Sequence, residues 1–223
     1  MTAMIRAVLF DLDGTVLDTA PDMAGALSQL RQEHALAPLP FDAVRSAVSH
    51  GSARVVKAGF PDADAEGFLA LQRRFLEIYS GALSRETRLF AGMDEVLRAL
   101  ANWRMKSGIV TNKPAWLTDP LLAELGLSAR FVCVVSGDTL AERKPHPKPL
   151  LHAAALAGVS ASECIYVGDA ERDVQAAHAA AMPALVAKYG YLRADEDASV
   201  WGADGYLDRP LDLLDWLKAS GRL

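Results

Sequence analysis

Asp11 and Asp13 follow directly after an apolar run, in the stretch AVLFDLDGTVLDT at residues 7–19. In an extended chain, residues two apart point to the same side, so both carboxylates can face one substrate. An Asp-Gly pair alone is typical of a turn, but a turn gives no reason for Asp11. Gly14 lets the backbone approach a ligand closely, and Thr15 offers it a hydroxyl and an amide. The stretch therefore predicts a reaction centre at the end of a buried strand.

Polar side chains also follow the later apolar runs, in chain order Thr111, Asn112, Lys144, Asp169 and Asp173. In open parallel sheets the ligand lies beyond the carboxyl ends of the strands, so we expect these residues to converge on the first two aspartates. Each of these residues could instead have a purely structural role. Thr-Asn can cap a loop, a lone lysine is usually solvated, and acidic residues often begin helices.

The elements that must position these residues are short apolar runs alternating with longer helical patterns. This alternation predicts an α/β fold, a doubly wound parallel sheet covered by helices. The predicted strands are 5–10, 106–110, 131–135, 164–167 and 184–187. The predicted helices are 93–102, 116–125, 149–157, 170–180 and a closing helix at 211–217.

Residues 20–85 break this alternation, because they carry helix-period apolar spacing and no strand pattern. We predict a helical cap at 19–85, inserted into a core formed by 1–18 and 86–223. Thr19 and the following Pro21 are typical of a helix start with Thr19 as its cap, so Asp18 is expected to be structural. Near the C-terminus, the polar stretch RADEDASVWGAD is expected to be an exposed loop.

Composition excludes several classes of protein. The net charge is −5, without the basic excess of a protein that binds nucleic acid or anionic lipid. No apolar run approaches the roughly 20 residues of a membrane helix, and the N-terminus resembles no leader, so we expect a cytoplasmic protein without membrane partners. Cys133 and Cys164 stand alone in apolar runs and are expected to be buried, reduced thiols. The oligomeric state is left open.

Four segments in this order, FDLDGT, VTNKP, KPHPKP and GDAERD, resemble the four motifs of the haloacid dehalogenase-like phosphatase superfamily. The resemblance spans nearly the whole chain. It implies a Rossmann-like core with a helical cap inserted after the first motif, which agrees with the helical insertion described above. It also implies a magnesium-dependent enzyme that acts on a small phosphorylated metabolite through an aspartyl-phosphate intermediate.

The resemblance assigns a role to each motif residue. Asp11 is the expected nucleophile, because an acyl phosphate divides one difficult displacement into two easier ones. Asp13 is the expected acid and base. Mg²⁺ would be held by Asp11, the backbone carbonyl of Asp13, and Asp169, since it prefers hard oxygen ligands. Asp173 is either an outer supporting ligand or a partner of Lys144.

Phosphate binding is expected from Thr111, Asn112 and Lys144 in the later motifs, together with Gly14 and Thr15 in the first. These groups can donate hydrogen bonds, or place a positive charge, where the phosphoryl group becomes most negative.

Substrate choice is expected to come from the cap. SHGSARVV, at 49–56, resembles the cap segment of phosphoglycolate phosphatase-like members, which makes His50, Gly51 and Arg54 candidate contacts. His50 is otherwise an ordinary cap histidine, and Arg54 an ordinary salt-bridge partner.

Overall, the sequence most resembles phosphoglycolate phosphatases, with N-acetylmuramic acid 6-phosphate phosphatases as the alternative suggested by residues 188–204. A phosphomutase and a non-catalytic phosphate-binding protein are less favoured. Thr15 stands where mutases more often have a bulky aliphatic residue, and all the expected polar groups are present.

Overall fold

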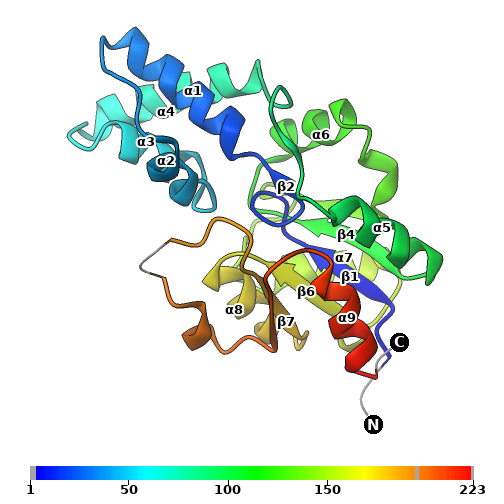
Figure 1. The fold of residues 1–223 in the computed structure, drawn as a ribbon. Coiled ribbons are helices and arrows are strands. Elements are labelled where there is room, and N and C mark those ends of the chain that lie inside the picture. Colours follow the sequence, from blue (N-terminus) through cyan, green and yellow to red (C-terminus); the bar gives the residue numbers. More distant parts are fainter. Residues whose placement is uncertain (1–3, 194–195, 222–223) are drawn as a thin grey trace.

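A computed structural model describes residues 4–193 and 196–221. In this part of the chain six strands form one parallel sheet in the order β5-β4-β1-β6-β7-β8 (Figure 1). The strands are β1 (Ala7–Phe10), β4 (Lys106–Val110), β5 (Cys133–Val135), β6 (Cys164–Gly168), β7 (Ala184–Ala187) and β8 (Gly205–Leu207). The predicted fold class is confirmed, and β1 lies in the middle of the sheet with β4 and β6 on either side.

Both faces of the sheet are covered by helices. Val8 and Phe10 of β1 point into one apolar cluster, and Ala7 and Leu9 point into the other. Helices on the first face are α5 (Met93–Asn102), α6 (Ala115–Glu124) and α9 (Asp212–Ala219). Helices on the second face are α7 (Lys148–Ala157) and α8 (Glu171–Ala179). Two buried faces explain why the central strands are apolar at successive positions instead of alternating with polar residues.

Most predicted elements agree with the structure to within one or two residues. The strand predicted at 5–10 begins at 7, and the one predicted at 131–135 begins at 133. The short edge strand β8 was not predicted, because three residues carry too little pattern. Within the predicted loop at 193–204, a 3-10 turn covers Ala198–Trp201, whereas residues 194–195 lie outside the described residues.

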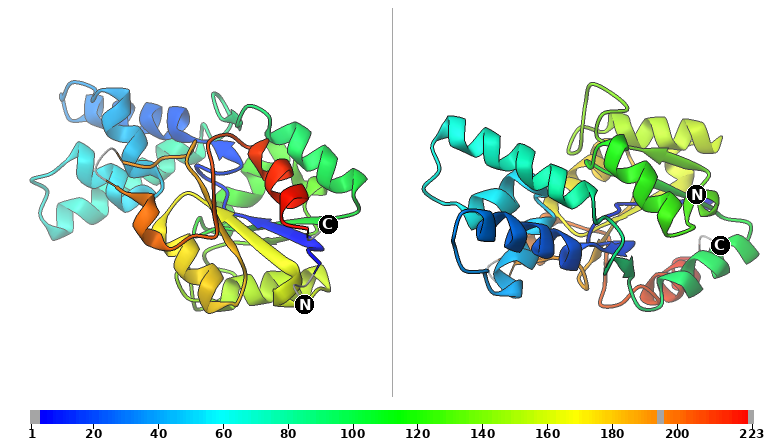
Figure 2. Two further views of the ribbon diagram at one scale, coloured as in Figure 1. Left: turned by 60° about the horizontal axis from the view of Figure 1, so that its bottom comes forward. Right: turned by 90° about the horizontal axis from the view of Figure 1, so that it is seen from above.

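Four helices fill the chain between the first strand and α5, as predicted for the insertion. They are α1 (Ala20–Glu33), α2 (Phe41–Val48), α3 (Gly51–Gly59) and α4 (Ala65–Ser80). Figures 1 and 2 show them gathered to one side of the sheet. We call these helices the cap. The boundaries proposed at 18/19 and 85/86 stay a prediction.

The cap joins the core through two short connections that pair with each other. β2 (Leu17–Asp18) leaves the core and is antiparallel to β3 (Arg88–Leu89), which returns to it. The Asp18 carboxylate accepts a hydrogen bond from the Tyr191 hydroxyl at 2.7 Å, which agrees with its expected structural role. Thr19 does precede α1, but its hydroxyl donates to Asp13 at 2.7 Å and does not cap the helix.

Asp22 ties the start of the cap to the returning connection. Its buried carboxylate accepts the backbone N–H groups of Glu86 at 3.0 Å and Thr87 at 2.8 Å, and the Thr87 hydroxyl at 2.7 Å. The Asp22 carboxylate therefore holds the two connections between cap and core together. The placement of the cap over the core depends on this contact.

Two smaller predictions concern the cysteines and the membrane. Cys133 and Cys164 are buried and unbridged, as predicted, and burial raises the pKa of each thiol to about 11. Among the described helices, none has both the length and the apolar character of a membrane-spanning segment.

Replacing Asp22 by alanine leaves the backbone N–H groups of Glu86 and Thr87 without their acceptor. Because an unpaired buried donor is costly, we expect Asp22→Ala to lower the free energy of unfolding by about 2 to 3 kcal/mol, measured by urea denaturation. Thr87→Val removes only the hydroxyl contact and should cost about 1 kcal/mol. A stability of Asp22→Ala equal to that of the wild type contradicts this role.

Candidate active site

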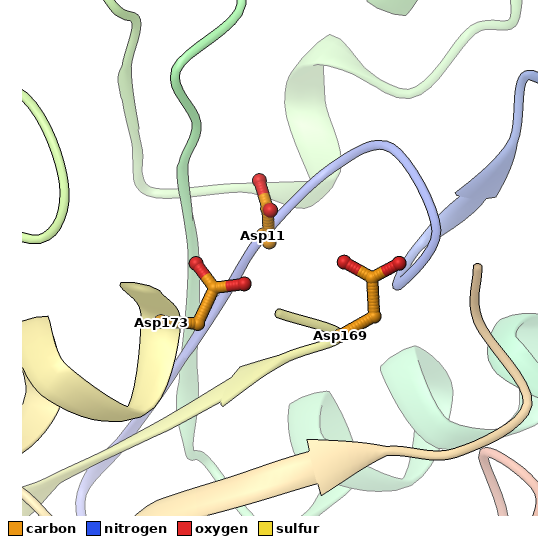
Figure 3. A group of neighbouring side chains, drawn as sticks. All are labelled: Asp11, Asp169 and Asp173. Carbon is orange, nitrogen blue, oxygen red and sulfur yellow. The ribbon is translucent and has the colours of Figure 1, made fainter. Parts of the chain in front are cut away.

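Three buried carboxylates meet at the carboxyl edge of the sheet. Asp11 directly follows β1, Asp169 directly follows β6, and Asp173 lies in the first turn of α8. One oxygen of each lies within 4.8 Å of the others, and Figure 3 shows the three carboxylates close together at this edge. The predicted convergence of residues from separate strands is therefore present.

Lys144 places a positive charge among these carboxylates. Its Nζ lies 3.0 Å from Asp11 Oδ1 and 2.7 Å from Asp173 Oδ1, and it donates to the Tyr166 hydroxyl at 2.7 Å. The Lys144 side chain is completely buried, with 0% of its surface exposed. The lysine is therefore the internal counter-ion of the cluster, and the solvated alternative is wrong.

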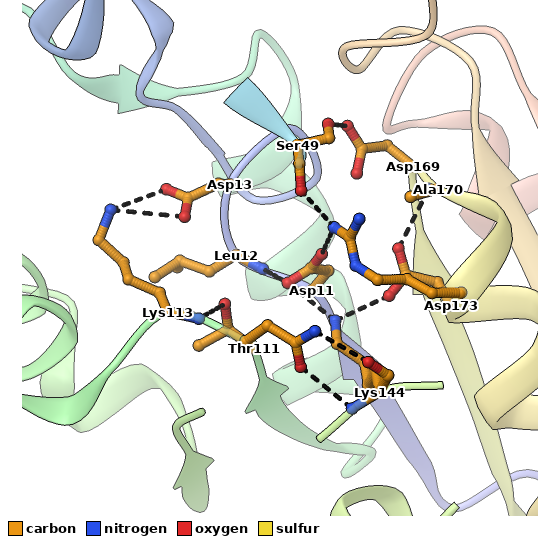
Figure 4. A network of polar contacts seen from close by, with 12 residues as sticks. Asp11, Leu12, Asp13, Ser49, Thr111, Lys113, Lys144, Asp169, Ala170 and Asp173 are labelled. Atoms are coloured by element: carbon orange, nitrogen blue, oxygen red, sulfur yellow. Dashed lines mark hydrogen bonds and ion pairs between the residues drawn. The ribbon is translucent and has the colours of Figure 1, made fainter. Parts of the chain in front are cut away.

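Asn112 holds the backbone of Lys144. Its side-chain amide donates to the Lys144 carbonyl at 3.0 Å, and its side-chain oxygen accepts the Lys144 N–H at 3.1 Å (Figure 4). Asn112 lines the neighbouring cavity, but its side chain is engaged in holding the lysine backbone. Its acceptor and one of its donors are therefore already used, and its contact with phosphate stays a prediction.

Burial and mutual repulsion raise the pKa values of Asp11 and Asp169. For Asp11, burial raises the pKa and Lys144 opposes this shift only in part. For Asp169, burial, Asp11 and Asp173 raise the pKa to about 7, against hydrogen bonds from Ser49 and the Tyr191 N–H. The cluster is therefore short of positive charge, and a cation that entered it would stabilise the ionised carboxylates.

The residues present fit Mg²⁺. Asp169 Oδ1 is buried and has no hydrogen-bond partner, and carboxylate oxygens are the hard ligands that Mg²⁺ prefers. Asp173 differs, since Oδ1 contacts Lys144 and Oδ2 accepts the Ala170 N–H at 3.1 Å. Asp11 and Asp169 are thus better placed to hold an ion, and Asp173 holds Lys144.

The first loop passes very close to Asp169. Gly14 has a positive φ of 81°, and a Cβ atom at this position would lie 2.0 Å from Asp169 Oδ2, so only glycine fits. Thr15 is fully buried and its hydroxyl has no hydrogen-bond partner. Thr15 also does not line the cavity described below, and its contact with phosphate stays a prediction.

Asp13 lies on the cap side of the site. Its Oδ1 accepts hydrogen bonds from the Thr19 hydroxyl at 2.7 Å and from Lys113 Nζ at 3.1 Å. Lys113 also donates to the Tyr79 hydroxyl of α4 at 2.8 Å. Burial opposes the charge on Lys113, but Asp13 and Tyr79 raise its pKa overall. Lys113 was not predicted as a site residue, although it directly follows Asn112 in VTNKP.

A cavity of about 460 Å³ lies between the core and the cap. Asp11, Asp13 and Thr111 line it from the core, and His50 and Gly51 line it from the cap, as predicted. The Thr111 hydroxyl accepts the Lys113 N–H at 3.2 Å and keeps its own hydrogen for another acceptor.

Arg54 does not line this cavity, and its contact with the substrate stays a prediction. It lies one helical turn beyond His50 and lines a second hollow of about 350 Å³, together with Lys57 and Arg193. Of the segment 49–56, only the first five residues, 49–53, line the cavity that Asp11 also lines.

Ser49 and Arg172 join the cap directly to the carboxylates. The Ser49 hydroxyl donates to Asp169 Oδ2 at 2.5 Å, and its carbonyl accepts from Arg172 at 2.5 Å (Figure 4). The Arg172 guanidinium also lies 3.8 Å from Asp11 Oδ2. Neither residue was singled out from the sequence, although both lie inside segments that were, SHGSARVV and GDAERD.

The metal-free protein should lose stability as the pH rises from about 5 to about 7. The pKa of Asp169 is about 7 in the folded protein and about 3.9 in an unfolded chain, so the folded state binds more protons across this window. The stabilisation from this proton is complete below the unfolded pKa and is lost as the pH passes the folded one. Urea denaturation of the chelator-treated protein at stepped pH measures this slope.

The Asp169→Asn variant has no titrating group at this position. Its free energy of unfolding should therefore change less with pH between about 5 and 7. Mg²⁺ should stabilise the wild type most at the upper end of the window, where the carboxylates are ionised. Identical slopes for the wild type and Asp169→Asn contradict the assignment.

Comparisons with known proteins agree with this geometry. Residues 8–187 match the family model of haloacid dehalogenase-like hydrolases. A phosphoglycolate phosphatase of Xanthomonas campestris pv. campestris is 44% identical over 93% of this chain and 94% of its own length. An N-acetylmuramic acid 6-phosphate phosphatase of Pseudomonas putida is 35% identical over 94% of each chain. A solved Haemophilus somnus structure, described as a "predicted phosphoglycolate phosphatase", has a TM-score of 0.85 at 25% identity and covers 95% of this chain and 97% of its own. The chain therefore belongs to the haloacid dehalogenase-like hydrolase family.

Proposed function

We propose that the protein is a Mg²⁺-dependent phosphatase that hydrolyses small phosphate monoesters through a phosphoaspartate on Asp11. The observation that carries this proposal is the position of the Asp11 carboxylate. It lies at the wall of the cavity, beside the buried Lys144 and within reach of two further carboxylates. A nucleophile, a fixed cation and hard oxygen ligands are thus together at one point.

The two oxygens of Asp11 are in different surroundings. Oδ1 accepts the Leu12 N–H at 2.7 Å and lies 3.0 Å from Lys144, whereas Oδ2 has only the longer 3.8 Å contact with Arg172. We therefore assign the attack on phosphorus to Oδ2. The new bond is an acyl phosphate, and the ester oxygen leaves with a proton from Asp13. In the second step Asp13 takes a proton from water, which attacks phosphorus, releases inorganic phosphate and restores the Asp11 carboxylate.

Charge at the phosphoryl group is met by residues of the cavity wall. Arg172 and the free hydroxyl hydrogen of Thr111 are placed to contact its oxygens, and Lys144 offsets the charge of Asp11 during approach. Mg²⁺, held by Asp11, Asp169 and the Asp13 carbonyl, would supply the charge that lets phosphate and carboxylate come together. Burial of the carboxylates keeps water from screening these interactions.

Asp11→Asn should abolish phosphate release from 2-phosphoglycolate and p-nitrophenyl phosphate, with a loss of about a thousandfold or more, because the amide is a poor nucleophile. Chelation of Mg²⁺ should have a similar effect that added Mg²⁺ reverses. The measurement is steady-state release of inorganic phosphate, with Lys188→Met at the surface as a control variant. Full activity of Asp11→Asn, or turnover without metal, contradicts the mechanism, and an isomerised product in place of free phosphate indicates a mutase.

Phosphoglycolate is the substrate that we propose first, since relatives 44% identical over most of the chain are named phosphoglycolate phosphatases. The cavity supports a second candidate, N-acetylmuramic acid 6-phosphate, which is the substrate in the name of the 35% identical relative. A volume of about 460 Å³ exceeds what a two-carbon acid fills, and Trp116, which is 52% exposed, offers an apolar ring at its wall.

The ratio of kcat/KM for these two substrates decides between them. If the sugar phosphate is the substrate, Trp116→Ala should lower its kcat/KM by about tenfold, the size of a lost apolar contact, with little change for 2-phosphoglycolate. An equal loss on both substrates means that Trp116 does not contribute to the choice. A kcat/KM that favours 2-phosphoglycolate in the wild type rejects the second candidate.

A further inference from the structure

We propose that Lys113 is a positioning residue that holds Asp13 in place for proton transfer, and that Tyr79 makes this placement depend on the cap. The inference rests on the function proposed above, because it concerns how the acid of that reaction is aligned. Three segments far apart in the sequence meet here: the loop after β1, the loop after β4 and the cap helix α4.

Lys113 lines the cavity, and the short polar contacts of its ammonium are with Asp13 of the core and Tyr79 of the cap. Its side chain is 5% exposed, and its Nζ lies 3.1 Å from Asp13 Oδ1 and 2.8 Å from the Tyr79 hydroxyl. The ammonium also lies 4.7 Å from the centre of the Tyr79 ring. A buried ammonium with two short polar contacts and an aromatic face is already satisfied, so its charge acts on Asp13.

These contacts distinguish the two oxygens of Asp13. Oδ1 accepts from both Thr19, at 2.7 Å, and Lys113, whereas the one contact of Oδ2 within the described residues is the 3.4 Å contact with Lys113. Oδ2 is therefore the oxygen that remains to exchange a proton with the leaving group or with water. Thr19 and Lys113 together fix the orientation of the carboxylate plane. The direction in which Oδ2 points is therefore fixed as well.

Tyr79 connects this arrangement to the cap. It is a buried residue of α4, stacked on Phe75 with ring centroids 6.1 Å apart, so its ring moves with the helix. Its hydroxyl reaches the Lys113 ammonium of the core. If α4 shifts, one of the two short contacts that orient Lys113 is lost, and Asp13 is then held by Thr19 alone.

The loss of rate that a misplaced general acid causes depends on the leaving group of the substrate. The alkoxide that leaves 2-phosphoglycolate needs a proton, whereas the p-nitrophenolate ion leaves without one. A defect in phosphate binding or in the fold would slow both substrates equally. The ratio of the two cleavage rates therefore separates positioning of Asp13 from a structural role.

The test measures the first turnover of both substrates with Mg²⁺ present, by rapid quench for 2-phosphoglycolate and by absorbance for p-nitrophenolate. Lys113→Met should slow cleavage of 2-phosphoglycolate by about ten- to a hundredfold, part of the usual contribution of a general acid, and p-nitrophenolate release by less than about threefold. Tyr79→Phe keeps the ring and should show the same pattern with a smaller loss. Lys113→Arg should recover part of the 2-phosphoglycolate rate.

Lys188→Met is the matched control, because it removes a lysine paired with Asp208 at 2.6 Å on the surface, and it should leave both rates unchanged. Equal losses on both substrates in Lys113→Met, or no loss, overturn the inference. If Lys113→Met fails to fold, Tyr79→Phe and Lys113→Arg decide by the same ratio. A wild type that cleaves neither substrate contradicts the proposed function itself, which is a different result from any change in the ratio.

Discussion

The burial of several carboxylates at one edge of the sheet is the constraint on which the rest of the site depends. Burial, and after it repulsion from Asp11 and Asp173, raises the pKa of Asp169. Lys144 offsets part of this repulsion from inside the cluster. Its ammonium must therefore be held firmly, which explains why Asn112 fixes its backbone and Tyr166 accepts from its side chain. The negative charge that Lys144 does not offset makes this edge of the sheet suitable for a divalent cation.

The cap is held to this edge by contacts that lie next to the chemistry. Asp22 fixes the connections between cap and core, Ser49 donates to Asp169, and Tyr79 reaches Lys113. The Ser49 contact lies beside the carboxylate that would hold the metal, and the Tyr79 contact lies beside the residue that would transfer the proton. A cap bound in this way covers the cavity and, in the proposed reaction, can couple the arrival of a substrate to the alignment of the core.

The sequence predicted more of the core than of the cap, for a physical reason. The strands that carry Asp11 and Asp169 are apolar and regular, and the ends of parallel strands share one edge, so their meeting follows from strand order alone. The partners of Asp13 and Asp169 from outside the sheet, Lys113 and Ser49, were missed although both stand within quoted motifs. Arg54 lines a different hollow from His50, because the surface that a cap residue reaches depends on how its helix packs.

By itself the sequence determined the fold class, the helical insertion and the residues that meet at the carboxyl edge, since the alternation of apolar runs with helical patterns is a local property of the chain. Only the tertiary structure decided what each polar group contacts. Asn112 holds Lys144, Thr15 is buried, and Thr19 binds Asp13, because packing decides which partners come within reach of a polar group that folding buries. Spacing along the chain can place a side chain at an edge of the sheet, but its partner there comes from a distant segment.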